Sequence, residues 1–71
     1  MTKQEIKRDI QAMYPGSVWL NTNDTAKVIR RNRTEVRAFM KDYPSQRSGN
    51  GKFYLIGDIA DRLYEGMQYG N

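Results

Sequence analysis

Apolar residues recur at helical spacing near the start of the chain. The residues that share this spacing are Ile6, Ile10, Met13 and Tyr14. They stand at i, i+4, i+7 and i+8, which is one face of a helix. Thr2 and Glu5 have the spacing of a capping box, in which each side chain accepts a hydrogen bond from the other residue's backbone N–H. Because Pro15 and Gly16 end the pattern, we predict a helix over residues 2–13 with this face toward the core.

A short extended segment and a short helix are predicted next. Residues 17–20, SVWL, are rich in β-branched and aromatic side chains, which indicates a strand or an extended lead-in. We expect Trp19 to lie in the core, since a single tryptophan in a small domain is more often its largest core residue than a base-stacking platform. Thr22 suits the N-cap of a helix that contains Ala26 and Ile29 and ends at residue 30 or 31.

A second helix is predicted to begin almost at once, because Asn32 and Glu35 repeat the capping-box spacing. A short helix, a tight turn and a second helix form the helix-turn-helix pattern, which we predict over residues 22–43. Pro44 ends it. On the second helix the residues predicted to face the core are Val36, Phe39, Met40 and Tyr43. The opposite face carries a stripe made of Arg33, Thr34, Arg37 and Lys41.

The last third of the chain predicts a β-hairpin and a final helix. Asn50-Gly51 is a favoured pair for the centre of a tight hairpin turn, so we predict a hairpin over residues 45–56. Alternate residues of the returning strand, 53–56, are expected to pack inward. A helix follows over residues 57–66, with Gly66 as the candidate C′ glycine that ends it. Its inward residues are predicted to be Ile59, Ala60, Leu63 and Met67.

Positive charge is concentrated in the middle of this sequence. The chain has 71 residues and a net charge of +4. Residues 27–52 contain eight lysines and arginines against only Glu35 and Asp42, a local net charge of +6, so the rest of the chain carries −2. Solubility alone does not require this segregation, whereas a surface that binds a polyanion does. We therefore predict an anion-binding face built from residues 27–52.

The composition argues against catalysis. The chain has no cysteine and no histidine, which removes disulfides, thiolate metal sites and the usual acid–base group at neutral pH. Three carboxylates, Asp58, Asp61 and Glu65, share one face of the last predicted helix. Such a face could hold a hard cation, but we interpret it as a solvated helix face. We expect no enzyme activity, no metal, no cofactor and no small-molecule ligand.

The same reading predicts a cytoplasmic protein of one domain, residues 1–71. The charged start, MTKQEIKRDI, argues against a secretion signal. The longest uninterrupted apolar stretch is residues 53–56, which is too short to span a bilayer, so we expect no contact with a membrane.

The predicted order of helix, turn, helix, proline, hairpin and helix resembles the small excisionases of phages and mobile elements. It is more distantly similar to the DNA-binding domains of MerR-type regulators. The resemblance covers about residues 20–66 and is carried by Leu20, Thr22, Ala26, Ile29, Asn32, Val36, Arg37, Pro44, Gly51, Tyr54, Ile59 and Leu63. The chain departs from the family pattern at Arg30 and Arg31, where the family usually has glycine and then an apolar residue, and at Glu35, where it has threonine or a similar residue.

The resemblance implies an α+β, mostly helical fold: a winged helix-turn-helix with an extra N-terminal helix and one hairpin wing. It also implies binding to double-stranded DNA, with the second helix of the pattern in the major groove. The recognition-helix candidates are Arg33, Thr34, Arg37 and Lys41. The candidates from the first helix and the turn are Lys27, Arg30 and Arg31, and those from the wing are Arg47, Asn50 and Lys52.

An excisionase performs no covalent chemistry. The resemblance implies an architectural role, in which copies bind neighbouring sites, bend the DNA and direct an integrase of the tyrosine recombinase type toward excision. The partners expected are therefore DNA, further copies of the chain and an integrase. Three alternatives stay open: a small phage transcriptional regulator with the same fold, a module that docks on an acidic protein, and a subunit of a DNA-packaging enzyme.

Overall fold

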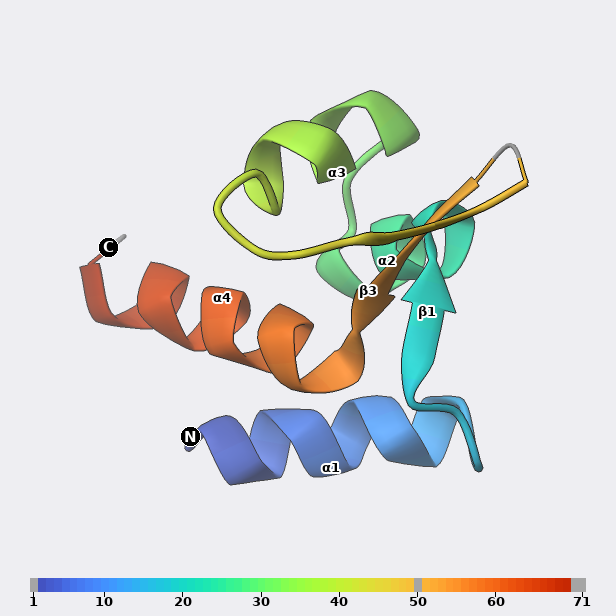
Figure 1. The fold of residues 1–71 in the computed structure, drawn as a ribbon. Helices are drawn as coiled ribbons and strands as arrows, with labels where there is room; N and C mark the ends of the chain where they lie inside the picture. The colour runs from blue at the N-terminus through green and yellow to red at the C-terminus, as the bar shows by residue number, and fades with distance from the viewer. Residues whose placement is uncertain (1, 50, 70–71) are drawn as a thin grey trace.

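The computed structural model describes residues 2–49 and 51–69, which form four α-helices and a three-stranded antiparallel sheet (Figure 1). The helices are α1 (Lys3–Met13), α2 (Thr22–Ile29), α3 (Arg33–Phe39) and α4 (Ile56–Tyr69). The strands are β1 (Trp19–Asn21), β2 (Gln46–Ser48) and β3 (Gly51–Leu55), in the order β1-β3-β2. The predicted class, α+β and mostly helical, is confirmed. No helix in the described residues is long and apolar enough to cross a membrane.

Helix α1 begins as predicted. The backbone N–H of Thr2 donates to Glu5 Oε1 at 2.9 Å, and the N–H of Glu5 donates to Thr2 Oγ1 at 3.2 Å, which closes the capping box. Ile6 and Ile10 are buried, and α1 lies alongside α4 (Figure 1). The prediction for Met13 was wrong, because its side chain is 57% exposed. Met13 is the last residue of the helix, and the residues after it turn away toward β1.

The sheet has one face toward the core. Leu20 of β1 pairs with Tyr54 of β3, and both side chains are buried. Trp19 pairs with Leu55, and both are only half-buried. Successive side chains of a strand point to opposite faces, so Leu20 takes the inward position and Trp19 points to the other face. The prediction that Trp19 lies in the core was therefore wrong.

Helix α2 is followed closely by α3, with residues 30–32 between them. The N-cap of α2 is Asn21 rather than Thr22, since the side chain of Asn21 accepts a hydrogen bond from the N–H of Asp24 at 2.7 Å. At the end of α2 the backbone of Arg30 is left-handed, with φ 58° and ψ 44°. This conformation lets the N–H groups of Arg30 and Arg31 both donate to the carbonyl of Ala26.

Helix α3 has the predicted start and an earlier end. The side chains of Asn32 and Glu35 form the second capping box. Val36 is 0% exposed and Met40 is 1% exposed, which confirms the core-facing side of the helix. However, α3 ends at Phe39 instead of continuing to Tyr43. Proline disfavours helical backbone in the residue before it, so Pro44 acts against a helix that continues to Tyr43.

The hairpin and α4 also differ from their predicted bounds. Ser48 pairs with Gly51, so Gly51 belongs to strand β3 and not to the centre of the turn, where it was predicted. The predicted turn residue Asn50 itself lies outside the described residues. The inward packing of Tyr54 and Ile56 is confirmed. Helix α4 runs to Tyr69, so the prediction that Gly66 ends the helix was wrong.

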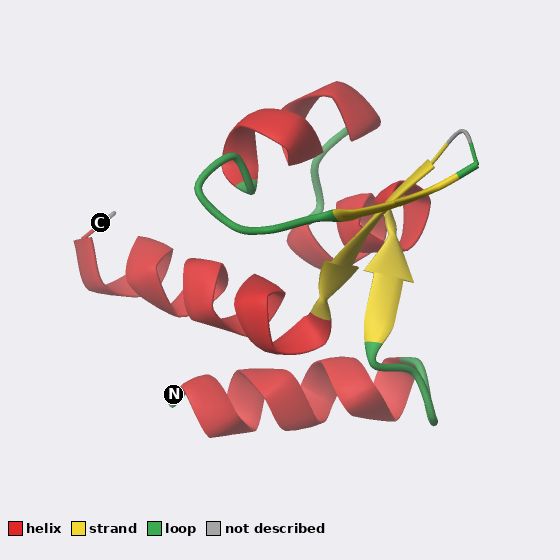
Figure 2. Ribbon diagram, viewed as in Figure 1, coloured by secondary structure: helices red, strands yellow, loops and turns green. Residues whose placement is uncertain are grey.

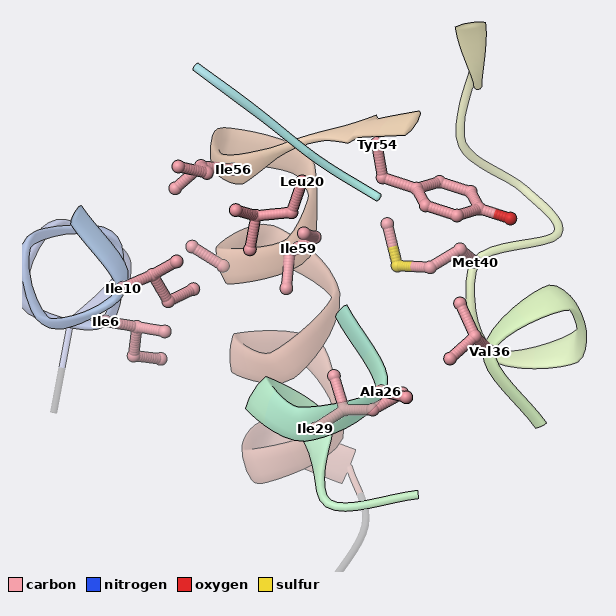
Figure 3. Close-up of a cluster of buried hydrophobic side chains, with 11 residues drawn as sticks. Ile6, Ile10, Leu20, Ala26, Ile29, Val36, Met40, Tyr54, Ile56 and Ile59 are labelled. Atoms are coloured by element: carbon pink, nitrogen blue, oxygen red, sulfur yellow. The ribbon is translucent and has the colours of Figure 1, made fainter. Parts of the chain in front are cut away.

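The core lies between the helices and the inner face of the sheet. Figure 3 shows its side chains, with Val36 and Met40 directed toward Tyr54. Ile59 and Ala60 of α4 are buried as predicted, and Leu63 is half-buried. The buried cluster consists of Ile6, Ile10, Leu20, Ala26, Ile29, Val36, Met40, Tyr54, Ile56, Ile59 and Ala60. Met67, the fourth predicted inward residue of α4, lies outside the described side chains.

Polar contacts attach α4 to its neighbours. Lys3 Nζ lies 2.6 Å from an oxygen of Asp61, and the hydroxyl of Tyr43 donates to Asp61 at 3.3 Å and to Glu65. Burial raises the pKa of Tyr43, and the two carboxylates act in the same direction, so the hydroxyl stays protonated as a donor. Asp61 and Glu65 thus hold α1 and the segment after α3 against α4. One oxygen of Asp58 is buried and has no hydrogen-bond partner among the described residues, and burial raises the pKa of this carboxyl.

Replacing Arg30 with glycine is expected to stabilise the fold. A left-handed backbone costs an L-residue about 1–2 kcal/mol, and glycine avoids this cost at the expense of about 0.5–1 kcal/mol of chain entropy. We expect Arg30→Gly to raise the free energy of unfolding by about 0.5–1 kcal/mol, measured by urea denaturation. Lys27→Gly, which removes the same charge inside α2, should lower it by about 1 kcal/mol. Destabilisation by Arg30→Gly would contradict this account.

Acid should remove the contribution of Asp61 to stability. The hydrogen bond from Lys3 lowers the pKa of Asp61 below its ordinary value of 3.8. A carboxyl with a lowered pKa in the folded state stabilises the fold above its ordinary pKa and loses that effect as the pH falls through the folded value. The difference in unfolding free energy between wild type and Asp61→Asn should therefore be constant near neutral pH and shrink below about pH 4. Asp42→Asn, a change at an exposed carboxylate, serves as the control.

Candidate functional site

A groove with a volume of about 680 Å³ lies between α3 and the β2–β3 hairpin. The residues that line it, which together define the basic groove, are Thr22, Arg33, Thr34, Arg37, Arg47, Gly49, Gly51 and Lys52. Figure 2 shows how the two walls arise, because the hairpin extends away from α1 and α4 and passes beside α3. Five of the predicted DNA-contacting residues therefore come together: Arg33, Thr34, Arg37, Arg47 and Lys52.

One wall of the basic groove is the N-terminal half of α3. Arg33 and Arg37 are four residues apart, which places them on the same side of the helix. The burial of Val36 against the core fixes the rotation of α3 about its axis, so that Arg33, Thr34 and Arg37 are exposed. The Asn32 cap fixes the start of the helix directly before Arg33.

The other wall is the hairpin. Arg47 of β2 stands directly opposite Lys52 of β3. Lys52 is two residues before Tyr54, so it belongs to the same face of the sheet as that buried side chain. The inner face of the sheet thus continues beyond the core and presents Arg47 and Lys52 toward α3. The hydroxyl of Thr22 donates to the carbonyl of Lys52 at 3.3 Å and attaches this wall to the start of α2.

Among the residues that the structure describes, four cationic side chains and no carboxylate line this groove. Like charges at i and i+4 of a helix, and directly opposite each other in a sheet, repel. Arg33 with Arg37, and Arg47 with Lys52, are such pairs. Arg37 also acts on Tyr54: burial raises the pKa of that hydroxyl, and the guanidinium opposes the shift. Repulsion between these cations lowers the free energy of unfolding, and a nearby negative charge relieves it.

The hairpin end of the groove has exposed backbone. Gly49 has φ 59°, in the left-handed region that favours glycine. A side chain added at Gly49 would meet no other atom within 4 Å, so that end of the groove is open. Backbone N–H groups at such a position are accessible to phosphate oxygens.

The remaining predicted site residues lie elsewhere. Arg31 pairs with Glu35 at 3.2 Å and lines a second groove, described below. Lys27, Arg30 and Lys41 are exposed and do not line the basic groove. Lys41 lies beyond the end of α3, so the prediction that it continues a helical stripe from Arg37 was wrong. Asn50 lies outside the described residues.

Sequence reasoning missed three residues of the groove. Gly49 and Gly51 were assigned only to the hairpin turn, and Thr22 was interpreted only as a helix cap. The contact between Thr22 and Lys52 joins positions thirty residues apart. No local sequence pattern predicts a contact between residues so far apart. The glycines on either side of Asn50, in contrast, could have predicted exposed backbone.

Comparisons with known proteins give no match that bears on the function of this groove. No protein-family model matches the chain, and no curated protein and no solved structure matches it.

Salt should stabilise the free protein by screening the basic groove. At low ionic strength we expect Arg37→Gln to raise the free energy of unfolding by a few tenths of a kcal/mol, because one like-charge contact is removed. The gain should disappear near 1 M salt, where the screening length is about 3 Å. Arg8→Gln removes the same charge from the exposed face of α1 and should give no such gain. Urea unfolding at several salt concentrations measures both, and equal behaviour of the two variants would contradict the repulsion.

Proposed function

We propose that this chain is a sequence-specific DNA-binding protein of the winged-helix type, with α3 as the recognition helix and the β2–β3 hairpin as the wing. The observation that carries the proposal is the basic groove, where Arg33, Arg37, Arg47 and Lys52 converge from segments on either side of Pro44. The two like-charge pairs, Arg33 with Arg37 and Arg47 with Lys52, disfavour folding. A bound polyanion compensates for that repulsion.

The proposed mechanism assigns different roles to the two walls. The major groove of B-DNA is about 12 Å wide and admits an α-helix. Arg33, Thr34 and Arg37 are exposed on the N-terminal half of α3, the part of a recognition helix that contacts base edges. A bidentate arginine–guanine contact contributes about 1–3 kcal/mol of discrimination. Arg47 and Lys52 contact phosphates beside the major groove, and these contacts fix position without reading sequence.

The resemblance of residues 20–66 to excisionases supports an architectural role within this proposal. Copies of the chain bind neighbouring sites, bend the DNA and direct an integrase toward excision, without covalent chemistry of their own. A single module of this size buries about 600–1,000 Å² on DNA. Bending costs on the order of 1–6 kcal/mol, which contacts between neighbouring copies offset.

Selection of preferred sites from random duplex DNA tests this proposal. Direct repeats about one helical turn apart are expected for copies bound side by side. Inverted repeats would instead favour a dimeric transcriptional regulator. If no sequence is enriched and retention on DNA does not depend on salt, the DNA-binding proposal fails.

Arg37 should matter more for selected DNA than for random DNA. We expect Arg37→Gln to weaken binding to the selected site by roughly tenfold or more, equivalent to about 1.4 kcal/mol, and to weaken random-DNA binding less. With about four phosphates neutralised, affinity should fall roughly a hundredfold between 50 and 200 mM salt. Fluorescence anisotropy measures both effects, with Arg8→Gln on α1 as the charge-matched control. Equal losses on both DNAs would reassign Arg37 to a phosphate contact.

A further inference from the structure

A second groove, with a volume of about 620 Å³, lies between α3 and α4. The residues that line this α3–α4 groove are Ile29, Arg31, Glu35, Ala38, Phe39, Arg62, Leu63 and Gly66. Figure 1 shows the two helices, α3 and α4, that supply six of the eight lining residues. Its residues on α3 are Glu35, Ala38 and Phe39, and none of them lines the basic groove. A molecule bound here therefore leaves the four cations of the basic groove free.

Arg62 is the second cation of the α3–α4 groove, beside Arg31. Its Nε donates to the carbonyl of Phe39 at 3.0 Å, and its guanidinium stacks 4.4 Å from the centre of the Phe39 ring. These contacts hold the planar group across the gap between α4 and the end of α3. Among the described residues, no carboxylate oxygen lies within 4.0 Å of the Arg62 guanidinium. In contrast, Arg31 is already paired with Glu35. A guanidinium fixed in this way is suited to bind a carboxylate.

Gly66 keeps space open beside that guanidinium. It lies inside α4, where glycine costs about 1 kcal/mol relative to alanine. A Cβ at this position would lie 3.7 Å from Arg62 Nη1, which is an ordinary contact, so packing does not require glycine. Because Gly66 has no side chain, the surface of α4 next to Arg62 is not covered at this position. A ligand can therefore approach the guanidinium from the groove.

Apart from the Arg31–Glu35 ion pair, the other residues that line the groove are apolar. Phe39 and Leu63 are half-buried, Ile29 is buried, and Ala38 is exposed on α3. A groove between two helices with an apolar surface commonly accepts the apolar face of a third helix. Arg62 at the side of the groove favours a ligand that carries a negative charge at that point. Together these features specify both the shape and the charge of the molecule that fits.

We propose that the α3–α4 groove binds an amphipathic helix of a partner protein, through apolar side chains against Phe39 and Leu63 and an Asp or Glu side chain paired with Arg62. Charge complementarity with the Arg62 guanidinium favours an acidic helix. This site is separate from the basic groove and does not depend on DNA binding.

The test uses a phage-displayed library of amphipathic helical peptides, randomised along one face and selected on the immobilised full chain. We expect the enriched peptides to share an Asp or Glu beside large apolar residues. Titrating an enriched peptide into ¹⁵N-labelled protein should shift the amide signals of Ala38, Phe39, Leu63 and Gly66. Arg62→Gln should weaken binding at least tenfold. Changing the peptide's acidic residue to its amide should cost a similar factor with wild type and little with Arg62→Gln.

Because Arg62 also contacts the end of α3, a second variant keeps the guanidinium in place. Gly66→Glu supplies a carboxylate next to Arg62 and should abolish peptide binding, whereas Gly66→Ala should retain it and raise thermal stability. Binding of Gly66→Glu to DNA should equal that of wild type, which separates this test from that of the DNA proposal. The proposal is overturned if no peptide is enriched, if the enriched peptides lack an acidic residue, if they shift other amides, or if Gly66→Glu binds them normally.

Discussion

The burial of Val36 and Met40 in the core that they share with Tyr54 of β3 determines which side of α3 faces the hairpin. Val36 and Met40 are fully buried against a core that includes Tyr54 (Figure 3). Each such side chain contributes roughly 1.5–3 kcal/mol of burial free energy. In a small domain with a thin core that is a substantial share of the stability. This contact sets the rotation of α3 and its distance from the hairpin, and so creates the basic groove.

The basic groove places like charges together where folding alone favours opposite ones. Arg47 and Lys52 are directly opposed like charges, and Arg33 and Arg37 repeat the conflict along α3. A sequence selected only to fold would place opposite charges at these positions. Local violations of folding rules are typical of functional sites. Arg30 adds a third case, because its left-handed backbone favours glycine.

Helix α3 is too short to be stable alone, since isolated helices below about 12–15 residues are marginal in water. Its start is held by the Asn32–Glu35 capping box and its end by the hydrogen bond from Arg62 to Phe39. The same seven-residue helix therefore forms one wall of two grooves. If both proposals hold, α3 links DNA on one side to a protein partner on the other, while Tyr43 anchors the following segment to α4.

The sequence by itself determined the features that depend on residues a few positions apart. The Thr2–Glu5 and Asn32–Glu35 capping boxes, the hairpin and the inward Tyr54 follow from such local patterns. Tertiary structure decided the rest. Leu20 and not Trp19 is buried in the core, because the sheet register determines which face of the strand is buried. The approach of Arg33 and Arg37 to Arg47 and Lys52, and of Arg62 to Phe39, requires core packing that joins distant segments. Local spacing carries no information about those distances.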